Sequence, residues 1–170
     1  MGQRFRGTDT HKVDAKGRVS IPADFRRVLD SGDPEREPGQ NPSVIVLFGD
    51  TRNPWFDCYT AAAMEEIDAL IEEMDDGDPD RIVLEEYFYA NALTIRLDDA
   101  GRLVLTRALR ERIGITDQAC FQGRGKTFRI FSPDVPGEAV SQLGARLADM
   151  PRERSIASLL PSRRGRAPAE

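Results

Sequence analysis

Two five-residue stretches of the sequence combine an aspartate, a glycine and an arginine at the same spacing. The first runs from Asp14 to Arg18 (DAKGR) and the second from Asp98 to Arg102 (DDAGR). An Asp side chain can bond the backbone of its own turn, and glycine supplies the positive φ that a tight turn needs. Arginine ends each stretch with a planar fork of N–H donors that suits a phosphate or a guanine edge. The pattern predicts two tight loops, each ending in an arginine that is suited to contact nucleic acid.

The same residues also fit a purely structural role. An ion pair between Asp14 and Arg18 could do no more than stiffen the turn. Both roles are compatible, because a paired carboxylate would also aim the guanidinium. Lys16 adds a cation to the first loop, whereas Ala100 takes the equivalent place in the second.

The charge of the chain is unevenly spread. The 170 residues carry a formal net charge of −5, which by itself argues against nucleic acid as a partner. By segment, residues 1–29 carry +4, 30–95 carry −14, 96–129 carry +4 and 130–170 carry +1. The acidity therefore lies in one central stretch, and each flanking basic stretch contains one of the loops. Such asymmetry indicates a charged partner at particular faces of the molecule.

The two basic stretches also repeat each other in sequence. Residues 13–29 (VDAKGRVSIPADFRRVL) match residues 97–113 (LDDAGRLVLTRALRERI) with a shift of 84. This shift pairs Asp14 with Asp98, Gly17 with Gly101, Arg18 with Arg102, and Phe25-Arg26 with Leu109-Arg110. We expect an internal duplication whose pseudo-two-fold places two similar loops side by side.

Each repeat is expected to fold as a turn, a short strand, a short helix and a hairpin, with a further helix appended. The expected strands are 18–21, 43–48, 55–59, 91–97, 102–105, 118–122 and 127–131. Short helices follow Pro22 and Thr106, longer ones span 60–76 and 78–90, and a C-terminal helix follows Ser132-Pro133 through Val140, Leu143 and Leu147. Accordingly, residues 1–76 form a first half with a loop extension at 30–42, residues 77–150 a second half, and residues 151–170 a mobile tail.

Further basic residues are weaker candidates for DNA contact. Arg4 and Arg6 precede the first loop and could bind phosphates, or lie solvated on a strand. Arg124 and Lys126 lie in a predicted hairpin turn, where charge is common. The tail carries Arg163, Arg164 and Arg166, which could touch DNA or remain solvated.

Several other patterns favour structural explanations. The cluster Asp75, Asp76, Asp78 and Asp80 lacks the glycine and terminal glutamate of a calcium-binding EF-hand, so a capped helix–helix connection is preferred. The aromatic run at 87–89 could stack bases but is more typical of core and subunit contacts. Cys58 and Cys120 are expected to be small buried residues, with a thiol role or a bridge as the alternatives.

No enzyme signature is present in the sequence. His11 is the single histidine, and no C-x-x-C pair, G-x-S-x-G, Walker or dinucleotide-binding loop occurs. We therefore expect no catalytic residues, metal, cofactor or small-molecule substrate. The chain has no run of 18 apolar residues and no apolar signal-peptide core, so we expect no membrane contact and a cytoplasmic, nucleoid-associated location.

The segment VDAKGRVSIPADFR, with Phe5 and Gly7 ahead of it, resembles the MraZ family of bacterial transcription regulators. The second D-x-x-G-R stretch and the preceding YFYANA at 87–92 fit the same family, and the likeness runs from about residue 3 to residue 150. It implies a mainly β fold with helices, namely a double-split β-barrel of the AbrB type built from the two repeated halves. It also implies ring-shaped homo-oligomers that bind promoter repeats in double-stranded DNA ahead of the cell-division and cell-wall genes.

The family's DNA-facing positions map onto Asp14, Lys16 and Arg18 in the first loop and onto Asp98 and Arg102 in the second. The second loop departs from the pattern at Ala100 and Thr106, so we expect it to contribute less to DNA binding. The leading hypothesis is a sequence-specific DNA-binding regulator. A ring-forming scaffold whose acidic helices bind proteins, and an antitoxin-like regulator that sequesters a toxin, are the alternatives.

Overall fold

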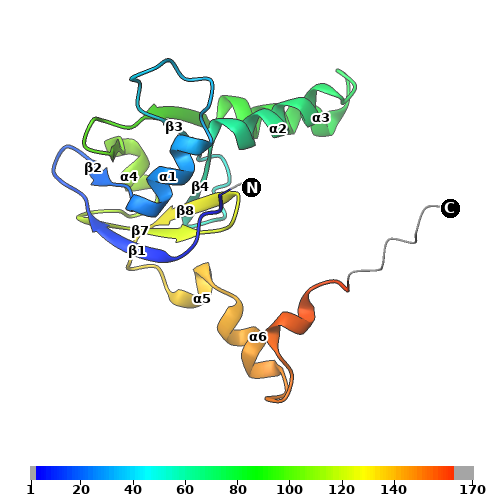
Figure 1. Cartoon of the computed structure of the whole chain (residues 1–170). Helices are drawn as coiled ribbons and strands as arrows, with labels where there is room; N and C mark the ends of the chain where they lie inside the picture. The colour runs from blue at the N-terminus through cyan, green and yellow to red at the C-terminus, as the bar shows by residue number, and fades with distance from the viewer. Residues whose placement is uncertain (1–2, 163–170) are drawn as a thin grey trace. The chain divides into compact units, whose positions relative to one another are not determined.

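The computed structural model describes residues 3–162, which divide into a unit ending at Val135 and a second unit beginning at Pro136. The first unit holds every strand found in the described residues (Figure 1). Its strands are β1 (Thr8–Lys12), β2 (Arg18–Ser20), β3 (Ser43–Leu47), β4 (Trp55–Tyr59), β5 (Ala92–Arg96), β6 (Arg102–Val104), β7 (Gln118–Gly123) and β8 (Thr127–Phe131). Its helices are α1 (Ala23–Ser31), α2 (Ala61–Glu72), α3 (Pro79–Glu85), the π-helical turn η1 (Glu86–Ala90) and α4 (Arg107–Arg112).

The sheet shows that the two halves of the chain are interleaved. A six-stranded antiparallel sheet has the order β1-β7-β8-β4-β3-β5, and β2 pairs separately with β6. In the sequence repeat, β1 corresponds to β5, β7 to β3 and β8 to β4. Equivalent strands therefore occupy equivalent positions counted from the two edges of the sheet. The first strand of each half therefore pairs with the hairpin of the other half. The fold is mainly antiparallel β with helices, as expected, although the strand pairing of the described chain does not close into one barrel.

The strand registers locate the pseudo-two-fold expected from the repeat. In the β2–β6 pair Val19 lies opposite Leu103, its own counterpart 84 positions later. In the β4–β8 pair Asp57 lies opposite Arg129, and the flanking partners are arranged symmetrically about them. The axis thus passes through the centres of both strand pairs. The two ends of the β2–β6 pair carry the two D-x-x-G-R loops.

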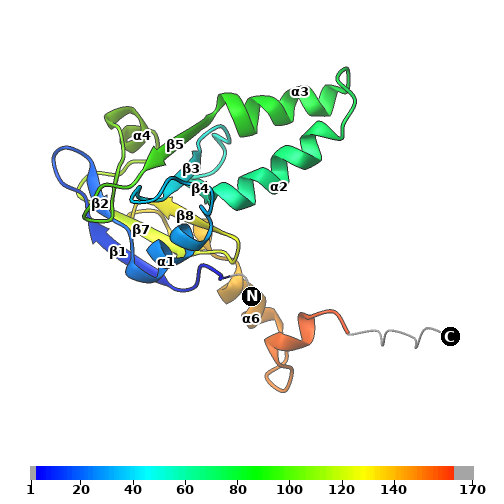
Figure 2. The same ribbon diagram turned by 45° about the horizontal axis from the view of Figure 1, so that its top comes forward.

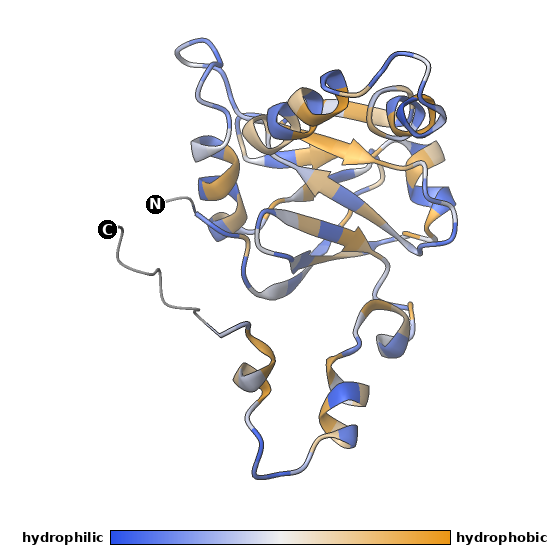
Figure 3. Cartoon of the chain, turned by 90° about the vertical axis from the view of Figure 1, so that its right-hand side faces the viewer, coloured by the Kyte–Doolittle hydropathy of each residue, from blue (hydrophilic) through white to orange (hydrophobic). Residues whose placement is uncertain are grey.

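The core of the first unit lies between the six-stranded sheet and the short helices α1 and α4. Every residue of β3 is buried, and Figure 3 shows this strand almost uniformly hydrophobic. Phe5, Phe25 and Phe128 form an aromatic cluster with ring centroids 4.9–5.2 Å apart. Leu29, Leu103 and Leu105 are fully buried. Helices α1 and α4 are therefore fixed by packing against the same core that holds the strands.

Helices α2 and α3 project from the sheet as an antiparallel pair, away from the end that carries β2 (Figures 1 and 2). The Thr60 side chain caps α2 by accepting a hydrogen bond from the Ala63 backbone, as predicted. Helix α2 ends at Glu72 rather than at residue 76, and the Met74 carbonyl accepts a hydrogen bond from Arg81 instead of continuing the helix. The predicted second helix is helical throughout, but its last turn, η1, is π-helical.

The acidic stretch between these helices is a capped connection, as interpreted from the sequence. The Asp78 side chain accepts a hydrogen bond from the Asp80 backbone at the start of α3. Arg81 pairs with Asp76 at 3.0 Å and with Glu85 at 2.8 Å. Within residues 3–162, no group of three or more His, Cys, Asp or Glu side chains is arranged to hold a metal ion.

The extension at residues 30–42 is irregular, except that α1 runs on to Ser31. Arg36 organises it by donating hydrogen bonds to the carbonyls of Asp30, Asp33 and Gln40 at 2.7–3.0 Å. Further hydrogen bonds tie Asp33 to the Ser43 N–H and Asn41 to Asp99, so side-chain bonds rather than regular secondary structure hold the loop.

The second unit corrects the prediction of one C-terminal helix. It contains two short helices, α5 (Gly137–Val140) and α6 (Leu143–Asp149), because Ser141 between them is extended and its hydroxyl accepts a hydrogen bond from the Leu143 backbone. The segment expected to be an irregular tail includes a 3-10 turn, η2 (Ile156–Leu159). Arg163, Arg164 and Arg166 lie outside the described residues. Among residues 3–162, none of the helices combines the length and the hydrophobicity that spanning a bilayer requires.

Candidate nucleic-acid interface

The first loop is organised by the carboxylate of Asp14. Its Oδ1 accepts hydrogen bonds from the backbone N–H of Lys16 at 2.9 Å and of Arg18 at 3.0 Å. Its Oδ2 accepts a hydrogen bond from Nε of Arg18 at 2.6 Å. Gly17 closes the turn with a φ of +81°, a conformation that favours glycine. The predicted turn and the predicted ion pair are both present.

The second loop repeats this geometry. Oδ1 of Asp98 accepts from the backbone N–H of Ala100 and Arg102, both at 2.9 Å, and Oδ2 accepts from Nε of Arg102 at 2.8 Å. Gly101 has a φ of +73°. The replacement of Lys16 by Ala100 leaves the loop backbone unchanged and removes only a charge.

The two loops are hydrogen-bonded to each other's halves by matching contacts. The Leu105 N–H donates to the Gly17 carbonyl at 2.8 Å, and the Ile21 N–H donates to the Gly101 carbonyl at 3.1 Å. Ile21 and Leu105 are counterparts in the repeat, as are Gly17 and Gly101. The structure thus brings the two loops side by side across the pseudo-two-fold.

Each loop arginine is aimed by its aspartate and remains half-exposed. The carboxylate accepts only from Nε of Arg18 and of Arg102, so the terminal Nη groups take no part in this bond. The side chains of Arg18 and Arg102 are 36% and 35% exposed. Such a guanidinium can donate two parallel hydrogen bonds to a phosphate or a guanine.

The same contacts shift the titration of the loop carboxylates. The backbone N–H of Arg18 makes the largest contribution to lowering the pKa of Asp14, and the Arg18 guanidinium lowers it further. Arg102 lowers the pKa of Asp98 in the same order of causes. Both carboxylates are therefore held in the charged form that accepts these hydrogen bonds.

Lys16 is exposed in the first loop, whereas Arg4 and Arg6 lie outside both loops. Both exposed arginines line a shallow hollow with Asp24 and Arg27, beside the start of α1. Neither is bonded to a loop residue in the described chain. The predicted site residues therefore form one cluster of five and a separate pair.

Sequence reasoning missed two arginines that touch the loops. Arg26 of α1 donates from Nη1 to the Ala100 carbonyl at 3.4 Å. Arg110 of α4 donates from Nε to the Leu105 carbonyl at 3.1 Å, beside Gly17. The repeat alignment pairs Arg26 with Arg110, which was the available signal, but it did not show that each arginine reaches the other half's loop.

The remaining candidates take structural positions. Tyr87 and Phe88 pack against a small cluster under α2, while Tyr89 is exposed. Cys58 and Cys120 are free and buried, as expected, and burial raises the pKa of the Cys58 thiol. Lys126 pairs with Glu66 at 3.1 Å.

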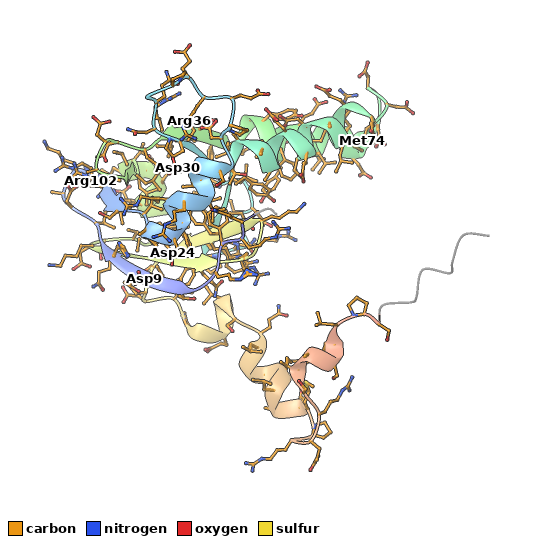
Figure 4. All side chains as sticks on the ribbon, in the orientation of Figure 1. Asp9, Asp24, Asp30, Arg36, Met74 and Arg102 are labelled. Carbon is orange, nitrogen blue, oxygen red and sulfur yellow. The ribbon has the colours of Figure 1, made fainter. Side chains whose placement is uncertain are left out.

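Charge is separated along the first unit. Figure 4 shows Arg102 at the end that carries the loops and Met74 at the far end of the projecting helices. The acidic side chains around Met74 are Glu72, Glu73, Asp75, Asp76, Asp78 and Asp80. An anionic partner would be attracted to the loop end and repelled by the helical tip.

Comparison with known proteins adds an independent observation. The family model for MraZ proteins, described as antitoxin-like, matches residues 4–33 and 88–142, which contain both loops. A protein of Ruegeria sp. (strain TM1040) named transcriptional regulator MraZ is 44% identical over 149 residues, covering 88% of this chain and 89% of the relative. A protein of the same name from Ruegeria pomeroyi is 45% identical, covering 78% of this chain and 80% of the relative. Another from Gluconobacter oxydans is 32% identical, covering 91% of each chain. The chain therefore belongs to the MraZ family.

Proposed function

We propose that the protein is a non-enzymatic, sequence-specific DNA-binding regulator of transcription. The single observation that supports this most is the pair of matching arginine loops, each bonded to the other half of the chain, at one end of the first unit and opposite an acidic helical tip. The relatives' shared name, transcriptional regulator, agrees with this function. The protein would act in the cytoplasm on the nucleoid and would need no cofactor.

In this proposal the loop residues have different tasks. Arg18 and Arg102 contact base edges or phosphates through their Nη groups, and Lys16 contacts a phosphate. Asp14 and Asp98 act by holding the loop backbones and aiming the arginines. Arg4 and Arg6 add phosphate contacts outside the loops, where they are solvent-exposed.

Family membership extends the proposal to assembly and target. The interleaved halves would form the double-split β-barrel of the AbrB type. Several protomers would form a ring, so that loops from different protomers bind successive promoter repeats ahead of the cell-division and cell-wall genes. Each loop pair would then bind weakly, and avidity would supply the affinity.

The proposal is tested by replacing Arg18 with Ala. Fluorescence anisotropy would measure affinity for DNA from upstream of the protein's own gene, with a scrambled duplex for comparison. Loss of one bidentate contact should weaken specific binding roughly tenfold per loop engaged. Arg52→Ala is the matched control, because Arg52 is also bonded to a nearby aspartate, Asp50, but lies beside α3.

Size-exclusion chromatography would check that both variants keep the oligomeric state of the parent. Equal affinities of Arg18→Ala and the parent for the specific duplex would contradict the assigned role. A wild-type protein that binds neither duplex would reject the function itself. Capture of a protein by the acidic helices, without DNA, would instead support the scaffold function, and capture of a toxin encoded next door would support the antitoxin-like one.

A further inference from the structure

Arg26 and Arg110 are counterparts in the repeat and occupy matching places. A Cβ atom added to Gly101 would lie 2.3 Å from Nη1 and 2.5 Å from Cδ of Arg26. A Cβ added to Gly17 would lie 3.1 Å from Nε of Arg110. Each arginine therefore lies against the bare Cα of the loop glycine that belongs to the opposite half.

The hydrogen bonds of these arginines point to backbone rather than to carboxylates. Arg26 donates to the carbonyl of Ala100, inside the second loop, and Arg110 donates to Leu105, whose own N–H holds the Gly17 carbonyl. Neither arginine forms an ion pair within residues 3–162, unlike Arg18 and Arg102. Both are half-buried, which limits their freedom to move.

We propose that Arg26 and Arg110 are positioning residues that hold the D-x-x-G-R loops crosswise, Arg26 the second loop and Arg110 the first. The planar guanidinium suits this task because it can lie flat against a glycine while it donates to a neighbouring carbonyl. Each half of the chain thereby sets the loop geometry of the other. The expected effect of these arginines on DNA binding rests on the function proposed above. Their expected effect on the conformation of the loops does not depend on that function.

Amide hydrogen exchange of the full-length protein tests the positioning without DNA. In Arg26→Ala, the amides of Ala100 and Arg102 should exchange faster, while those of Lys16 and Arg18 stay unchanged. In Arg110→Ala, the pattern should reverse. The matched controls are Arg27→Ala and Arg107→Ala, which remove exposed arginines of the same helices that pair with Asp24 and Glu111. Faster exchange in the same half's loop, in both loops equally or in neither would overturn the proposal.

Double-mutant cycles on DNA binding test the consequence. Arg26→Ala should weaken binding, but hardly further when Arg102 is already Ala, giving a coupling of roughly tenfold. Arg26 and Arg18 should act independently, and Arg110 should couple to Arg18 instead. Additive losses in every pair would overturn the coupling. If Arg26→Ala and Arg110→Ala each speed amide exchange in the opposite half's loop, the positioning is supported. If Arg18→Ala and Arg102→Ala then keep the parent's affinity for DNA, the proposed DNA contacts are rejected.

Discussion

The backbone N–H of Leu105 donates to the carbonyl of Gly17 at 2.8 Å, joining the end of β6 to the first loop. The Leu105 carbonyl lies so close to the Cα of Gly17 that a Cβ placed there would be 2.1 Å from its oxygen. The glycine thus meets two demands, a positive φ and a close approach between the halves.

Replacing Gly17 with Ala should destabilise the protein more than replacing Gly7, which has a φ of +91° but nothing within 4 Å of its Cβ position. Both variants carry the cost of a positive φ, about 1–2 kcal/mol. Only Gly17→Ala adds the clash with backbone, which should raise its cost by at least about 2 kcal/mol. Urea unfolding at a fixed protein concentration measures both, and equal losses would count against the close approach.

The loops could be predicted from the sequence because their bonds are local. Asp14 bonds atoms no more than four residues away, so the residue types and spacing determine the turn. The same holds for the Thr60 and Thr106 caps, each of which accepts from a backbone N–H three residues on. The repeat then places a second copy of each local structure.

The interleaving of the two halves in the sheet could not be predicted, because each edge strand could pair with either of two equivalent hairpins. β1 and β5 present similar edges, and either hairpin could accept either strand. Only the three-dimensional path of the chain decides that β1 pairs with β7 and β5 with β3. The crosswise contacts of Arg26 and Arg110 follow from that path, so the repeat alignment could show only that the two arginines are equivalent. The break between α5 and α6 at Ser141 was missed because apolar spacing alone does not report backbone extension.

Leu103 lies opposite Val19 on the pseudo-two-fold and is fully buried. Leu103→Ala should therefore lower the free energy of unfolding by about 2–5 kcal/mol, through lost burial and the cavity left behind. Its neighbour Val104 is 42% exposed, so Val104→Ala should change that free energy by no more than about 0.5 kcal/mol. Similar losses for the two variants, measured by urea unfolding, would contradict the burial of this strand pair.

Acid should remove the stabilisation that Asp14 provides. Its pKa is lower in the folded protein, because it accepts hydrogen bonds from Arg18, so the charged carboxylate stabilises the fold above its unfolded pKa. This contribution is lost as the pH falls through the folded pKa. The stability gap between the parent and Asp14→Asn should thus be constant near neutral pH and shrink below pH about 4.

Unfolding curves between pH 7 and pH 3 would measure this gap. Asp75→Asn is the matched control, since it makes the same charge change in the exposed connection between α2 and α3. If the stability gap between the parent and Asp14→Asn widens on acidification, the pKa of Asp14 is raised rather than lowered by folding.

Introducing a lysine into the second loop should strengthen DNA binding, and the gain should fall as the salt concentration rises. Ala100 is exposed at the position equivalent to Lys16, and its hydrogen bonds with Asp98 and Arg26 are made by its backbone, so Ala100→Lys should leave the loop intact. If the new cation reaches a phosphate, the slope of log affinity against log salt should steepen by about 0.9. Ala90→Lys adds the same charge at the exposed end of η1 and should leave the slope unchanged. A steeper slope in both variants would indicate diffuse charge attraction, and an unchanged slope in Ala100→Lys would place the second loop away from the DNA backbone.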